Sequence, residues 1–169
     1  WQSPVSTREK LSERTATIGD TLRLPVVWLQ ILIFFLYTGL ELTIGQWTFS
    51  VLTESRHFHP ELGGGLVAVY FESIGVGRVV FGAITERVGL DRLVRWGSFA
   101  AVLGMVGFAF VPSLNAVSLV LAGLGLAPIF PCLMARTPQR IGAPYAVRAI
   151  GFQVAAAMLG AAIAPGVAG

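Results

Sequence analysis

Five long runs of apolar residues alternate with short polar segments along the chain. The runs cover residues 25–51, 65–85, 94–112, 115–135 and 149–168. Each is close to the roughly 20 apolar residues that a membrane-spanning helix needs, and none shows the sustained alternation of a membrane strand. We therefore predict an all-α integral membrane protein, with five transmembrane helices in a domain over residues 25–169. A polar cytoplasmic linker segment over residues 1–24 precedes it.

The composition agrees with this pattern and excludes other classes. Of the 169 residues, 54% are hydrophobic and 12% are charged, whereas soluble domains carry about 25% charged residues. Disordered chains are excluded because they are poor in hydrophobic residues. The net charge of +3 comes from basic residues scattered between apolar runs, which argues against a nucleic-acid partner. The lone Cys132 lies in an apolar run, where we expect a packed thiol.

The basic residues give the orientation in the membrane. Ten of the 12 Lys and Arg residues fall before the first run, after the second or after the fourth, and Arg56 is the only one on the opposite side. Basic residues favour cytoplasmic loops. We expect a cytoplasmic N-terminus and a plasma membrane of the bacterial inner-membrane type. An odd number of spans suits part of a larger protein, with a complete five-helix protein as the alternative.

Three ionisable residues lie inside predicted spans: Glu41, Glu72 and Arg78. Such groups are costly in lipid and usually face a cavity or a partner. A carboxyl group near the middle of the membrane can take and release a proton near neutral pH, as proton-coupled transport requires. The alternative for both glutamates is a carboxyl group that only supports helix packing. For Arg78, pairing with a carboxylate or extension toward the cytoplasm is the preferred interpretation, and contact with a solute is the alternative.

Other polar and aromatic residues in the spans are candidate solute contacts. Gln46 offers an amide and Trp47 an aromatic surface, a combination that suits a sugar ring, although Trp47 is equally suited to anchoring at the membrane interface. Gln153 is set among alanines and glycines, where it binds a solute or bonds to another helix. Pro128 and Pro131 remove backbone donors, which predicts a bend beside a transport path or a static kink.

The chain carries none of the sequence signatures of a hydrolase, a phosphate-binding loop or a zinc site. The pair His57 and His59 is a weak metal motif. We therefore expect neither an enzyme nor a resident metal or cofactor.

The segment GAITERVGLDR, residues 82–92, resembles the cytoplasmic loop G-x-x-x-(D/E)-R-x-G-x-(R/K) of the major facilitator superfamily. The matching residues are Gly82, Glu86, Arg87, Gly89 and Arg92, with Arg92 one position late. Finer similarity is to the fucose-permease branch, in segments 35–47, 77–78, 127–131 and 151–153.

The resemblance implies helices 7–11 of a twelve-helix fold, which is part of its C-terminal six-helix half. Members of this branch are proton-coupled sugar importers that work by alternating access. Glu41 would then bind the proton or the sugar, with Gln46, Trp47 and Gln153 lining the solute cavity. Glu72, from its position inside the membrane, is a further candidate for binding the proton or the solute. The loop residues, through ion pairs of Glu86, Arg87 and Arg92, would latch the cytoplasmic side. The expected partners are a small solute, the bilayer and a missing N-terminal half, with the proton gradient as the energy source.

Two other functions stay open at this point. The aromatic residues of the first span and the prolines of the fourth would suit an efflux antiporter for amphipathic drugs. A non-transporting five-helix membrane module, such as a sensor or assembly partner, would also fit the composition.

Overall fold

The computed structural model describes residues 16–169, and this part of the chain is helical with connecting turns. Residues 1–15, most of the predicted polar linker, lie outside it. Five helical stretches are long and apolar enough to cross a membrane, which confirms the predicted fold class. They are Pro25–Ser55, Pro60–Thr85, Leu90–Phe110, Pro112–Ile141 and Ala143–Val167.

The helices follow one another with very short connections. In chain order they are α2 (Ile18–Leu22), α3 (Pro25–Ser50) with a π-helical end η1 (Val51–Ser55), α4 (Pro60–Val88), α5 (Leu90–Phe110), the 3₁₀ turn η2 (Pro112–Leu114), α6 (Asn115–Leu126), α7 (Ile129–Ala135), α8 (Thr137–Ile141) and α9 (Ala143–Val167). Proline stands in the first turn of α3, α4 and α9, where its missing N–H costs nothing. Gly89 separates α4 from α5 with φ 86°, a conformation that favours glycine.

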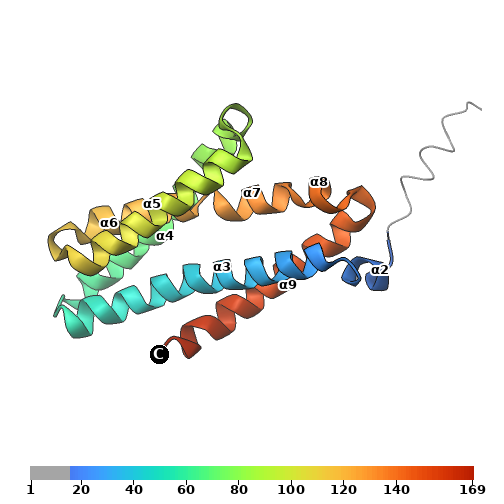
Figure 1. The fold of residues 1–169 in the computed structure, drawn as a ribbon. Coiled ribbons are helices and arrows are strands. Elements are labelled where there is room, and N and C mark those ends of the chain that lie inside the picture. The colour runs from blue at the N-terminus through green and yellow to red at the C-terminus, as the bar shows by residue number, and fades with distance from the viewer. Residues whose placement is uncertain (1–15) are drawn as a thin grey trace, which may run out of the picture.

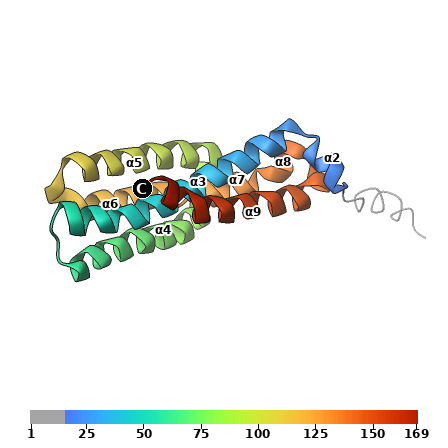
Figure 2. The ribbon, with the colours of Figure 1, turned by 90° about the horizontal axis from the view of Figure 1, so that it is seen from below.

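The long helices pack in two groups. In one group α3 lies along α9, and in the other α6 lies between α4 and α5 (Figures 1 and 2). Both groups rely on glycine for close approach. A Cβ atom on Gly160 of α9 would lie 2.1 Å from the Phe35 carbonyl oxygen of α3, and one on Gly125 of α6 would lie 2.4 Å from the Ala101 nitrogen of α5. Small residues at such contacts are how membrane helices come together without a hydrophobic driving force.

The two groups meet in an apolar core at which α3 contacts α4 and α6. Its buried members include Tyr37 of α3, Tyr70 of α4 and Leu126 of α6. The elements that carry the predicted membrane carboxylates therefore face each other across this core.

Arg56 connects three elements at the end of the bundle opposite α2. Its guanidinium donates hydrogen bonds to the side chain of Asn115, the first residue of α6, and to the carbonyl oxygen of Phe108 in the last turn of α5. It also lies 4.5 Å from the centroid of the Phe108 ring. Arg56, the only Lys or Arg residue on the predicted outer side, therefore holds the ends of these elements together.

Candidate functional site

Glu41 of α3 and Arg78 of α4 form an ion pair inside the predicted membrane. One guanidinium nitrogen, Nη2, donates to Oε1 at 3.0 Å and to Oε2 at 3.2 Å. Glu41 is only 6% exposed, whereas the Arg78 side chain keeps 44% of its surface exposed. Each charge compensates the other, which is what buried ionisable groups in a membrane need.

Aromatic side chains surround the pair. The hydroxyl of Tyr70 donates to the backbone carbonyl of Glu41 at 3.1 Å. The ring of Phe130 lies 5.9 Å from the Arg78 guanidinium carbon, within reach of a cation–π interaction, and packs edge-on against Phe34 at 5.0 Å between centroids. The pair therefore sits at the junction of α3, α4 and α7.

The fourth span is interrupted beside this junction. Helix α6 ends at Leu126 and α7 begins at Ile129, with Pro128 between them and Pro131 in the first turn of α7. The hydroxyl of Tyr37 donates to the Leu126 carbonyl at 2.8 Å, which supplies a partner at the break, where a membrane helix otherwise leaves carbonyls unsatisfied. A cavity of about 270 Å³ adjoins the break and is lined in part by Gly82, Pro128 and Pro131.

Gln153 lies in a second polar cluster, completely buried between α3, α8 and α9. Its Nε2 donates to Gln30 Oε1 at 2.8 Å and approaches Thr137 Oγ1 at 2.9 Å. The sequence interpretation missed Gln30 and Thr137. The signal for Gln30 was present, as a lone amide within an apolar run.

The remaining predicted solute contacts lie on the surface of the described chain. Gln46 and Glu72 are exposed. Trp47 is partly exposed, and its Nε1 donates to the carbonyl oxygen of Pro165 in α9 at 3.1 Å. Glu41 therefore pairs with Arg78, and Glu72, the second carboxylate predicted inside the membrane, lies apart from this pair.

The motif loop turns at Gly89, with Gly82 and Glu86 in the last turns of α4 and Arg87 at its end. Arg87 and Arg92 are exposed. Near this loop, Asp91 in the first turn of α5 forms an ion pair with Arg136 at the end of α7. An acidic residue in a first helical turn is favoured by the helix dipole, a signal that the sequence offered for Asp91.

Comparison with known proteins identifies the family. A family model described as Major Facilitator Superfamily matches residues 2–165. Bypass of stop codon protein 6 from Saccharomyces cerevisiae is 27% identical over an alignment of 162 residues, and the match covers 89% of this chain and 33% of that protein. The chain therefore spans about a third of the length of the curated relative it matches. No solved structure matches significantly. Because the family model covers nearly the whole chain, the chain belongs to the Major Facilitator Superfamily of membrane transporters.

Proposed function

We propose that the chain functions as part of a secondary active transporter, which moves a small polar organic solute together with protons by alternating access. A sugar is the first candidate, from the similarity to the fucose-permease branch. The proton gradient supplies the energy, and the solute site lies between this part and a second helical half. We place the protein in a plasma membrane with the N-terminal side of α3 facing the cytoplasm.

The observation that carries this proposal is the Glu41–Arg78 pair. A carboxylate that is only 6% exposed in a membrane helix costs free energy, so its presence there favours a functional role. In this proposal Glu41 alternates between a carboxylate that pairs with the half-exposed Arg78 and a protonated acid that does not. Exchange between these states is the chemistry that proton coupling needs.

The other predicted residues have supporting roles in this proposal. Gln46, Trp47 and Glu72 would face the solute path. Gln153 would contact the solute only if its buried cluster opens. Gly82, Pro128 and Pro131 would allow α4 and α7 to move, with Arg87, Arg92 and Glu86 holding the cytoplasmic end.

The test uses Glu41→Gln in the protein encoded by the complete gene, reconstituted in proteoliposomes. Under an imposed pH gradient, accumulation of labelled L-fucose, D-galactose or D-glucose should be lost, while solute exchange without a gradient is retained. Glu54→Gln is the matched control, because Glu54 is exposed in η1 at the end of the same helical stretch. Unchanged accumulation in Glu41→Gln would remove this residue from proton coupling.

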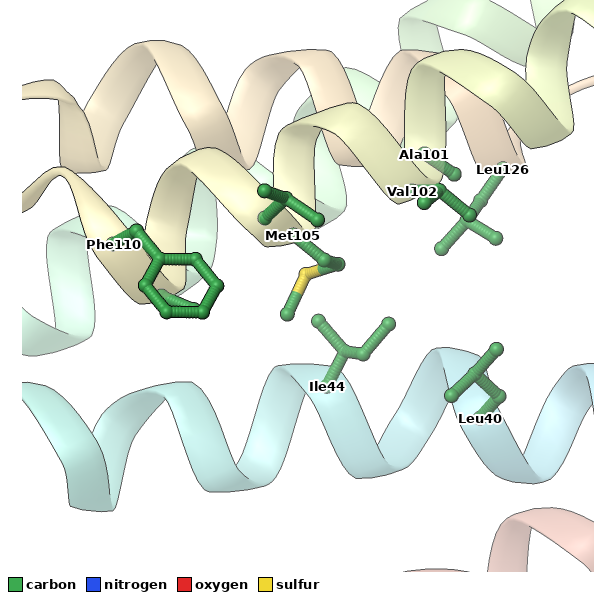
Figure 3. Close-up of a pocket in the computed structure, with 9 residues that line it drawn as sticks. Leu40, Ile44, Ala101, Val102, Met105, Phe110 and Leu126 are labelled. Atoms are coloured by element: carbon green, nitrogen blue, oxygen red, sulfur yellow. The ribbon is translucent and has the colours of Figure 1, made fainter.

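A second candidate function is efflux of amphipathic compounds, which a separate observation favours. A cavity of about 410 Å³ lies between α3 and α5, with Leu126 of α6 at one end (Figure 3). Its walls are apolar side chains, among them Leu40 and Ile44 facing Val102 and Met105. Such a cavity suits an apolar molecule rather than a sugar.

Filling this cavity separates the two functions. Ile44→Trp should abolish protection of cells against toxic amphipathic compounds if the cavity holds an efflux substrate. Leu36→Trp, on the exposed surface of the same helix, is the control. Sugar uptake that persists in Ile44→Trp, without any change in compound tolerance, would reject the efflux function.

A further inference from the structure

The Arg78 guanidinium has more donors than Glu41 uses. Both carboxylate oxygens of Glu41 accept from Nη2, so the N–H groups on Nη1 and Nε are not engaged by Glu41. Nη1 carries two of these N–H groups on one side of the planar guanidinium and Nε carries the third on the other side, so each nitrogen can donate a hydrogen bond to a carboxylate oxygen of a solute. Almost half of the Arg78 side chain is exposed, so this donor capacity can reach a solute.

Among the described residues, the recorded ion pairs link Glu41 and Arg78 only to each other. Tyr37 of α3 and Tyr70 of α4 are titratable groups that lie close to the pair. From α6 and α7 the pair meets the Leu126 carbonyl, through Tyr37, and the Phe130 ring. Helix α9 presents Gly160 and Ala164 to this part of α3. The charge of Arg78 is therefore balanced by Glu41 within the described residues.

Protonation of Glu41 upsets this balance. The empty pair has a net charge of zero, with Glu41 negative and Arg78 positive. When Glu41 binds a proton, Arg78 keeps a positive charge in a membrane interior, where an unpaired charge is costly. A solute with one carboxylate restores the balance, whereas a neutral sugar does not.

We propose that the Glu41–Arg78 pair is the binding site for a small solute carrying one carboxylate, such as a sugar acid, which binds to Arg78 when a proton binds to Glu41. This inference rests on the proposed function and specifies its solute. The loaded site holds neutral Glu41, positive Arg78 and the negative solute, so its net charge is again zero. One proton and one anion cross together, and the transport step moves no net charge.

The nearest cavity along α4 begins one helical turn beyond Arg78. It has a volume of about 270 Å³ and is lined in part by Gly82 and Pro131, but not by Glu41 or Arg78. In the proposed site the carboxylate of the solute lies at Arg78, and its ring extends from there.

D-Galacturonate and D-galactose form a matched pair of probes, because they differ by a carboxylate in place of a hydroxymethyl group. With the protein encoded by the complete gene in proteoliposomes, a gradient of one pH unit should drive about tenfold accumulation of galacturonate. A membrane potential of 100 mV at equal pH should not change it. Proton-coupled uptake of neutral galactose would carry one charge and would respond about 50-fold to the same potential.

Binding to the purified protein tests the site itself. Arg78→Lys keeps the charge but loses the N–H groups on Nη1 and Nε, and should weaken galacturonate binding about tenfold. Arg78→Met combined with Glu41→Gln leaves two neutral side chains, so the protein should fold while galacturonate binding is lost. Glu41→Gln alone should bind galacturonate without taking up a proton, as a pH-sensitive dye in weak buffer will report.

The outcomes separate this inference from the proposed function. Galactose accumulation driven by protons, with no binding of galacturonate, overturns the inference and leaves the proposed function standing. Galacturonate binding that depends on Arg78, without accumulation on any pH gradient, supports the site and overturns proton-coupled transport. Unchanged galacturonate binding in the double variant also overturns the inference.

Discussion

The indole nitrogen of Trp47 donates a hydrogen bond to the carbonyl oxygen of Pro165, at 3.1 Å, and so joins the ends of α3 and α9 that lie farthest from α2. Toward this end the two helices contact each other through small residues such as Gly39, Gly160 and Ala164, whereas the Gln30–Gln153 hydrogen bond joins them nearer to α2. Among the described residues, this is the side-chain hydrogen bond recorded between α3 and α9 at this end. It therefore holds the two helix ends together.

Replacing Trp47 with phenylalanine should remove this bond and keep an aromatic ring in place. We expect a loss of about 1 kcal/mol in the free energy of unfolding, measured by denaturant titration of the detergent-solubilised protein. Trp96→Phe is the control, because the Trp96 side chain is 66% exposed on α5. Equal effects of the two substitutions would show that the bond to Pro165 contributes nothing.

Gly160→Ala should destabilise the α3–α9 pair. The added Cβ would lie 2.1 Å from the Phe35 carbonyl oxygen, so the helices must separate, at a cost of about 1–3 kcal/mol. Gly151→Ala on the same helix meets no atom within 4 Å and should be neutral or slightly stabilising. Thermal denaturation of both variants measures the difference, and a stable Gly160→Ala variant would contradict the close packing.

Arg56→Met should loosen the end of the bundle at which α3, α5 and α6 meet. It removes charge-assisted hydrogen bonds to Asn115 and Phe108, for an expected loss of about 2 kcal/mol. Arg23→Gln is the comparison, because its 3.9 Å ion pair with Asp20 is exposed and such pairs contribute little. Faster proteolysis at residues 51–59 in Arg56→Met, absent from Arg23→Gln, would locate the change.

Gln153→Leu should lower the free energy of unfolding by more than the small change in side-chain volume suggests. The substitution leaves the buried side chains of Gln30 and Thr137 without the partner they share, which costs about 1–3 kcal/mol. Adding Gln30→Leu and Thr137→Val should recover most of this loss, because no polar group is then left unpaired. We expect solute uptake to persist in the stable triple variant, and its loss there would assign Gln153 to the solute.

The hydropathy pattern predicted the number and type of helices because length and apolarity alone decide whether a helix spans a membrane. The helix ends were less predictable. Helix α4 begins at Pro60, five residues before the apolar run at 65, since polar residues continue a helix beyond the lipid. Hydropathy marks the buried part of a helix and not its full length.

The pairing within the site was not predictable from one sequence. Glu41, Glu72 and Arg78 were recognised as unusual membrane residues, but the rotation of α3 against α4 decides which of them meet. That rotation turns Glu41 to Arg78 and leaves Glu72 exposed. The contact between Gln30 and Gln153 joins residues 123 positions apart, a separation that periodicity does not bridge.

The unequal lengths of the spans have a consequence for the surrounding lipid. The stretch Pro25–Ser55 has 31 residues and Leu90–Phe110 has 21, which correspond to about 46 Å and about 32 Å along the helix axis. The shorter helix matches a hydrocarbon thickness of about 30 Å, so the longer one must tilt or extend beyond it. If α3 extends on the side of η1, Arg56 and its partners Asn115 and Phe108 lie at the level of the lipid headgroups. The thickness of the bilayer then affects how strongly Arg56 holds the ends of α5 and α6.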